Sequence, residues 1–145
     1  MNVEKFFSKA QKAQILNAIK TAEKETSGEI RVHIESSCKK DVLERAVALF
    51  EKLGMHETQL RNGTLIYLAV KDKKFAIFGD EGINEVVPDT FWQEIRDTMQ
   101  EEFSANKFST GLVSGINLIG QKLKEFFPLS KDDINELPDD ISMGD

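Results

Sequence analysis

The stretch TLIYLAV, residues 64–70, is a continuous and almost wholly apolar run that ends at a charged triplet, residues 71–73. An apolar run without alternation is typical of a central strand that is buried on both faces of a sheet. The triplet is short enough to form a tight turn. Residues 74–78 should therefore return beside the run as an antiparallel strand.

Another strand is predicted at residues 29–35, where apolar and polar side chains alternate. A helical pattern follows it, with Asp41 as the cap and Gly54 after its end, and leads to the run at 64–70. A helical connection should make the two strands parallel, with a right-handed crossover. The apolar face of residues 29–35 carries Ile30, Val32 and Ile34, and the face expected to be wetter carries Arg31, His33 and Glu35.

Three further helices are predicted at residues 8–26, 88–105 and 109–126, with Ser8 as the N-cap of the first and Pro88 in the first turn of the second. The last helix contains Gly111, Gly115 and Gly120. Each glycine lowers its helix propensity by roughly 1 kcal/mol. We expect the glycines to be compensated by close packing, with the sheet as the candidate neighbour.

These elements predict an α/β fold class, a three-layer α/β/α sandwich with a small mixed sheet of three to four strands and helices on both faces. We expect one domain over residues 1–127, followed by an acidic C-terminal tail over residues 128–145. A length of 145 residues and an apolar content of 40% suit a single core.

The charge distribution is uneven, because residues 128–145 contain six acids and one base and carry −5 of the net charge of −6. A nearly neutral body and an acidic tail argue against nucleic acid and anionic membranes as partners. No apolar run is long enough for membrane insertion, and we find no signal peptide. The single cysteine, Cys38, fits a reducing compartment. We expect a cytoplasmic monomer with a protein partner left open.

The strand directions bring several polar residues to one end of the predicted sheet. Residues 29–35 and 64–70 begin there, and residues 74–78 end there, followed by a Gly-Asp-Glu-Gly turn. Clustered carboxylates favour a cation, and all-oxygen ligands suit Ca²⁺ or Mg²⁺. The ordinary alternative is that these acids cap helices, form turns or pair with arginine. The gathered acids are Glu29, Asp80, Glu81 and Asp89, and the supporting residues are Arg61, Asn62, Gly79 and Gly82.

The opposite end of the sheet carries Ser36, Ser37, Cys38, Lys71 and Asp72. Ligands often bind where parallel strands end. No triad is evident there, since the only histidines, His33 and His56, are dispersed.

The blocks SGEIRV (27–32), RNGTLIYLAV (61–70), FAIFGDEGIN (75–84) and FSTGL (108–112) resemble the TPM-domain family. The resemblance covers roughly residues 8–127. The chain looks like a member of the short standalone bacterial branch, whose members share the NELP segment at 135–138. The family's founders are a thylakoid-lumen protein, a photosystem-repair protein and an accessory protein of acetylcholine receptors. The resemblance implies an α/β/α sandwich, and divalent-cation binding, chiefly of calcium, through acids that match Glu29, Asp80, Glu81 and Asp89 here.

Three functions follow as hypotheses. The first is a binding or accessory module with a Ca²⁺ or Mg²⁺ site at the Glu29–Asp80 end of the sheet. The second, implied by the acid phosphatase activity of plant members, is a weak metal-dependent phosphatase in which Arg61 binds the phosphate. The third is a protein-interaction domain without metal that uses the acidic tail.

Overall fold

The computed structural model describes residues 2–129 and 141–144. Its strands are β1 (Glu29–Glu35), β2 (Gly63–Ala69), β3 (Lys74–Gly79) and β4 (Ile141–Gly144). Its α-helices are α1 (Lys9–Glu23), α2 (Val42–Lys52), α3 (Glu81–Asn84), α4 (Phe91–Ser104) and α5 (Phe108–Phe126), and two 3-10 helices are η1 (Val3–Lys5) and η2 (Met55–Glu57).

The four strands form one mixed sheet in the order β3-β2-β1-β4. β1 and β2 run parallel over their whole length, from Glu29 opposite Gly63 to Glu35 opposite Ala69. β2 and β3 run antiparallel, with Thr64 opposite Gly79. The predicted strand directions are confirmed, and the fold class is the α/β sandwich with a small mixed sheet that the sequence indicates.

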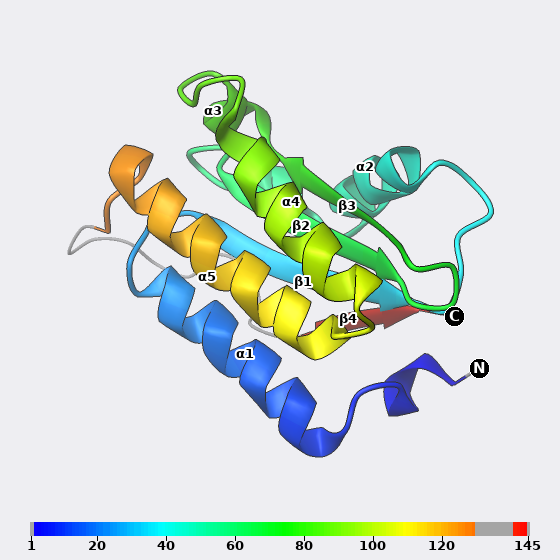
Figure 1. Ribbon diagram of the computed structural model, residues 1–145. Coiled ribbons are helices and arrows are strands. Elements are labelled where there is room, and N and C mark those ends of the chain that lie inside the picture. The colour runs from blue at the N-terminus through cyan, green and yellow to red at the C-terminus, as the bar shows by residue number, and fades with distance from the viewer. Residues whose placement is uncertain (1, 130–140, 145) are drawn as a thin grey trace.

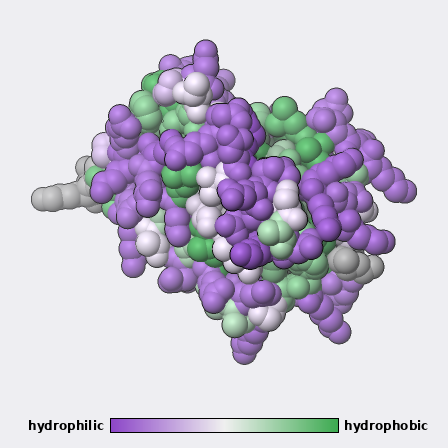
Figure 2. Space-filling view, in the orientation of Figure 1, coloured by the Kyte–Doolittle hydropathy of each residue, from purple (hydrophilic) through white to green (hydrophobic). Residues whose placement is uncertain are grey.

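Helices cover both faces of the sheet (Figure 1). α1, α4 and α5 lie on one face, and α2 lies on the other. The outer surface of the three-helix layer is largely hydrophilic (Figure 2). None of the described helices combines the length and apolarity needed to cross a membrane.

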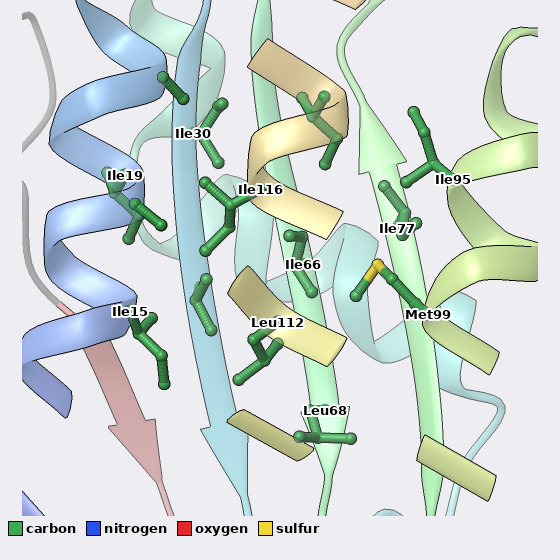
Figure 3. Packing of buried hydrophobic residues seen from close by; sticks show 14 of the residues in the cluster. Ile15, Ile19, Ile30, Ile66, Leu68, Ile77, Ile95, Met99, Leu112 and Ile116 are labelled. Atoms are coloured by element: carbon green, nitrogen blue, oxygen red, sulfur yellow. The ribbon is translucent and has the colours of Figure 1, made fainter. Parts of the chain in front are cut away.

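The larger core lies between the sheet and the three-helix layer. Side chains from α1, α4 and α5 point toward those of β1, β2 and β3, and the labelled ones are nearly all branched aliphatics (Figure 3). Every residue of β2 is buried, as the unbroken apolar run predicts. The labelled core residues are Ile15, Ile19, Ile30, Ile66, Leu68, Ile77, Ile95, Met99, Leu112 and Ile116.

The glycines of α5 allow it to lie close to two other helices. A Cβ at Gly111 would lie 2.5 Å from the Phe103 ring of α4, and a Cβ at Gly120 would lie 2.8 Å from the Ala22 Cβ of α1. Gly115 meets Met99 of α4 in the same way. The expected close packing is therefore present, but these glycines meet helices α1 and α4 and not the sheet.

Three expectations about the turns and helix boundaries need correction. Residues 79–82 do not form a simple turn, because Asp80 caps the short helix α3. Helix α4 begins at Phe91, and Pro88 precedes it and accepts a hydrogen bond from the Phe91 N–H with its carbonyl. Helix α1 ends at Glu23, three residues before the predicted end, while its Ser8 cap is confirmed by a reciprocal hydrogen-bond pair with Gln11.

The largest correction concerns β1, whose polar face is buried. Arg31, His33 and Glu35 are all less than 10% exposed, although this face is predicted to be the wetter one.

The C-terminal end of the chain contributes a strand that the sequence did not indicate. β4 runs parallel to β1, from Ile141 opposite Val32 to Gly144 opposite Glu35. It also lies against η1 at the start of the chain. The predicted acidic tail thus contains a short strand, and residues 130–140, with the NELP segment, lie outside the described residues.

Candidate functional site

An arginine–carboxylate pair lies at the end of the sheet where β1 and β2 begin. Arg61 Nε donates to Asp80 Oδ2 at 2.7 Å, and Nη2 donates to Oδ1 at 2.9 Å. Arg61 Nη1 also lies 3.0 Å from Glu81 Oε1. One guanidinium is therefore shared by two adjacent carboxylates, an arrangement called the Arg61 site below. The hydrogen bonds to Asp80 raise the pKa of Arg61.

The backbone around the Arg61 site is tightly built. Arg61 has a φ of 50°, in the left-handed region that few residues adopt without support. The Gly82 N–H donates to the Arg61 carbonyl at 2.8 Å, and a Cβ at Gly82 would collide with the carbonyls of Leu60 and Arg61. Gly79 is held equally closely against the Trp92 ring. Gly79 and Gly82 therefore allow neighbouring groups to lie closer to the backbone than any side chain would permit.

Asp80 has a second role in this structure. Its Oδ1 accepts from the Glu81 N–H at 2.8 Å and so caps α3, while its own N–H donates to the Gly63 carbonyl at 3.0 Å. Asp80 is 3% exposed, whereas the Glu81 side chain is 62% exposed. The buried carboxylate fixes the arginine, and the exposed one faces solvent.

Glu29 and Asn62 lie at the same end of the sheet, and the hydrogen bond between them joins their backbones. The Glu29 N–H donates to the Asn62 carbonyl at 3.3 Å, and both side chains are buried. Asn62 Nδ2 lies 3.5 Å from Ser27 Oγ, and Asn62 Oδ1 accepts no hydrogen bond from the described residues. Asp89 is exposed before α4, and no interaction within residues 2–129 and 141–144 joins it to the other acids.

These positions test whether a divalent cation fits the Arg61 site. Carboxylate and amide oxygens are suitable ligands, and the buried Asn62 Oδ1 without a donor is a spare acceptor. Both oxygens of Asp80, however, already accept from Arg61. Among the residues that the structure describes, no group of three or more His, Cys, Asp or Glu side chains is arranged to hold a metal ion. In this structure the guanidinium of Arg61 therefore occupies the place that a cation would need at Asp80.

A second polar cluster lies on the face of the sheet that α2 covers, and the sequence pattern did not predict it. Glu35 is its centre: Arg45 of α2 donates to both Glu35 oxygens at 3.1 and 2.6 Å, and Tyr67 Oη donates at 2.7 Å. His33 Nε2 lies 3.3 Å from Glu35, and its Nδ1 is hydrogen-bonded to Ser142 Oγ at 2.9 Å. We call His33, Glu35, Arg45 and Tyr67 the Glu35 cluster.

The environment of the Glu35 cluster shifts its pKa values. Burial raises the pKa of Glu35, but the donors Arg45, Tyr67 and His33 outweigh burial and hold this pKa at about 2. Burial lowers the pKa of His33, and contact with Glu35 only partly offsets it. Burial and the bond to Glu35 raise the pKa of Tyr67. Glu35 is thus a stable anion beside a neutral histidine.

The other sequence candidate, the loop end with Ser36 and Cys38, is closed by its own hydrogen bonds. Asp72 Oδ2 accepts from the Cys38 N–H at 2.7 Å, and the Ser36 carbonyl accepts from the Lys71 N–H at 2.7 Å. Cys38 is buried, with Sγ 3.2 Å from the Lys40 carbonyl. These contacts connect the end of β1 to the β2–β3 turn and give these residues structural roles.

The order of the strands and the helices on both faces place the chain among small three-layer α/β/α domains with a mixed sheet. The sequence model of the TPM domain matches residues 1–122, and the chain belongs to the TPM-domain family. None of the curated proteins compared with the chain matches it.

Solved structures support this assignment. The NMR structure of the BA42 protein from the psychrophilic bacterium Bizionia argentinensis is 49% identical, covers 99% of each chain and has a TM-score of 0.93. The N-terminal domain of a protein from P. gingivalis has a TM-score of 0.70 at 20% identity, over 85% of this chain and 80% of that one. The N-terminal domain of cg2496 from Corynebacterium glutamicum has a TM-score of 0.66 at 15% identity, over 80% and 73%. The last two share the fold alone.

Proposed function

We propose that this domain is a binding or accessory module that takes a divalent cation, Ca²⁺ or Mg²⁺, at the Arg61 site. The observation that carries the proposal is the shared guanidinium, because Asp80 and Glu81 already hold one positive charge between them. A metal ion would take the place of that charge, with the Asp80 and Glu81 carboxylates as ligands. The chain belongs to the TPM-domain family, and the resemblance described in the sequence analysis implies cation binding through acids that match Asp80 and Glu81.

Exchange of the two cations is physically reasonable. The Arg61 side chain is 40% exposed, so water can solvate its guanidinium once a metal ion balances the charge of Asp80 in its place. Asp80 is held by the α3 cap through its backbone and carboxylate, so it remains in place. The exposed Glu81 and the buried acceptor Asn62 Oδ1 would supply further oxygens. Hard oxygen ligands of this kind favour Ca²⁺ and Mg²⁺ over softer metals.

The test is a titration of the metal-stripped protein with Ca²⁺ and then Mg²⁺, followed by amide chemical shifts. We expect saturable shifts at residues 61–62 and 80–82. Asp80→Asn should abolish the shifts, whereas Arg61→Gln should bind several-fold more tightly because the competing internal charge is removed. Asp97→Asn, an exposed aspartate of α4, is the matched control and should bind as the unaltered protein does.

Equal affinity in the Asp80→Asn variant and the unaltered protein would rule the site out. Weaker binding in Arg61→Gln would also contradict the proposal, since it would show the guanidinium to be part of the site. In this structure Arg61, the residue that would bind the phosphate in the alternative phosphatase function, is engaged with the carboxylates of Asp80 and Glu81.

A further inference from the structure

Both ring nitrogens of His33 lie against β4. Ser142 Oγ is hydrogen-bonded to His33 Nδ1 at 2.9 Å. Gly144 lies beside the other nitrogen, because a Cβ at this glycine would be 3.2 Å from His33 Nε2. His33 is 4% exposed. The two atoms at which the imidazole takes or releases a proton are therefore covered by one short strand.

β4 is the strand of the sheet that has the fewest contacts. It has four residues, all half-buried, and it pairs with residues 32–35 at the outer edge of β1 (Figure 1). Apart from β1, its main neighbour is the 3-10 helix η1. By contrast, β1 is paired along its other edge with all seven residues of β2. β4 can therefore open locally while β1 and β2 stay paired, as the terminal segments of a fold commonly do.

The charged groups that face the His33 ring come from β1 and α2. Glu35 lies 3.3 Å from Nε2, and Arg45 is bound to Glu35. Tyr67 of β2 stacks beside the ring and is neutral. Burial lowers the pKa of His33 more than Glu35 raises it, and Arg45 and Arg31 lower it further. The described residues of β4 carry no charged side chain, so the strand buries the ring without offsetting a positive charge on it.

We propose that protonation of His33 and pairing of β4 with β1 oppose each other, which makes β4 a pH-sensitive element that leaves the sheet more readily in mild acid. While β4 is paired, the ring is neutral, with its hydrogen on Nε2 toward Glu35 and with Nδ1 accepting from the Ser142 hydroxyl. The inference goes beyond the cation site and does not depend on it, because that site lies at the other end of β1.

Departure of β4 changes the environment of the ring in one direction. Water reaches both nitrogens, whereas Glu35 stays beside the ring because Arg45 and Tyr67 hold it. Hydration with a retained anion favours the charged imidazole. His33 therefore binds a proton more readily when β4 is away. By linkage, a bound proton favours the departure of β4 to the same extent.

The sign and the size of the effect follow from the titration of a single group. The pKa of His33 is lowered while β4 is paired, so the coupling is absent well above the ordinary value of 6.5 and grows as the pH falls below it. One proton changes the ratio of the open to the paired state by at most about tenfold for each pH unit.

The first test is amide hydrogen exchange of the full ¹⁵N-labelled chain at pH 6.5 and 5.5, corrected for the intrinsic exchange rate. The amides that bond β1 to β4, within residues 32–35 and 141–144, should lose about threefold to tenfold in protection, whereas amides that bond β2 to β3 should not. In His33→Gln the protection should be the same at both pH values, and the control His56→Gln should keep the loss.

Three results of this test would overturn the proposal. The first is unchanged protection of the β1–β4 amides in the unaltered chain. The second is an equal loss at the β2–β3 amides, which would show that the whole domain opens. The third is an undiminished loss in His33→Gln, which would assign the pH dependence to other groups.

The second test measures the reciprocal effect and does not use a histidine variant. The uncharged substitutions Ile141→Asn/Met143→Asn should release β4, because both side chains pack against the larger core. Ring chemical shifts should then give a higher pKa for His33 in this variant than in the unaltered chain, while the pKa of His56 stays the same. An unchanged pKa of His33 in a variant whose β4 amides exchange freely would refute the coupling. If this variant loses β2 protection, Ser142→Pro, which removes one strand N–H, replaces it.

Discussion

Glu35 is the residue on which the α2 face of the sheet depends. It is 6% exposed and carries a negative charge, and burial of such a charge is costly unless donors surround it. Arg45 of α2 and Tyr67 of β2 supply those donors, and His33 Nε2 lies 3.3 Å from the carboxylate. A single carboxylate thereby links β1, β2 and α2.

We predict that Glu35→Gln lowers the free energy of unfolding by about 3 kcal/mol, because the neutral amide leaves Arg45 without its anion and turns an N–H₂ group toward other donors. Urea denaturation at pH 7 measures the change. Glu44→Gln, an exposed glutamate of α2, is the control and should change stability by less than about 0.5 kcal/mol. A similar loss of stability in both variants would show that removal of any negative charge near α2 destabilises the protein, and that the contacts of the Glu35 cluster are not the cause.

Gly82 is the residue that permits the Arg61 site. Because a Cβ there would collide with two carbonyl oxygens, we predict that Gly82→Ala costs roughly 2 kcal/mol and moves Arg61 away from Asp80. Denaturation and the amide shifts of residues 61 and 80 measure the two effects. Wild-type shifts at these positions would show that the backbone tolerates the methyl group.

Helix α5 is the element whose sequence is least suited to its conformation, since three glycines lie in its interior. Its neighbours α1 and α4 approach so closely at these positions that side chains would collide. The loss of helix propensity is offset by packing that no other residue permits. The element therefore owes its stability to tertiary contacts.

The three glycines differ in what opposes a methyl group. At Gly120 the opposing atoms include the Cα of Ala22, which is backbone and cannot turn aside. At Gly115 the opposing atoms are those of the Met99 side chain, which has three rotatable bonds. We predict that Gly120→Ala destabilises the protein by about 1–3 kcal/mol and that Gly115→Ala costs less, as the better helix former offsets part of the strain. Thermal unfolding compares the two, and the reverse order would contradict the packing argument.

At the scale of the whole molecule, the Glu35 cluster should make stability depend on pH. The pKa of His33 is lowered in the folded state, so between that value and 6.5 the unfolded chain binds more protons. Stability should therefore be fully present above pH 6.5 and fall as the pH drops below it. The pKa of Glu35 is lowered to about 2 in the folded state. The contribution of Glu35 to stability is therefore present above pH 4.5 and is lost as the pH falls toward about 2.

We predict that His33→Gln flattens the loss of stability between pH 6.5 and 5, because glutamine does not titrate there. Urea denaturation at several pH values measures the slope. The control His56→Gln replaces the other histidine, which lies in η2, and should leave the slope as it is in the unaltered chain. If both variants keep the original slope, groups other than His33 control this range.

The sequence predicts the parts of the fold that repeat a simple pattern over many residues. The run at 64–70 reads as a buried central strand, and Ser8 and Asp41 read as caps, because each signal is local. The buried polar face of β1 was not predictable in this way. Alternation of Arg31, His33 and Glu35 with apolar residues is what a solvated face also shows, and only the donors Arg45 and Tyr67 make burial possible.

β4 was missed for a different reason. Four residues in an acidic segment give too short a signal for a strand, and its position depends on contacts with β1 that are more than a hundred residues away in sequence. At the candidate site, strand direction correctly brought Arg61 beside Asp80 and Glu81. The sequence left open whether a cation or the arginine offsets the acids, and the structure shows the arginine in that role.

Because η1 rests against β4, the first and last described segments of the chain are neighbours (Figure 1). A donor and an acceptor dye attached to the two ends would therefore transfer energy efficiently while β4 is seated. Departure of the strand would separate the dyes and reduce the transfer. Energy transfer between dyes at the two ends would thus report whether β4 is paired with β1.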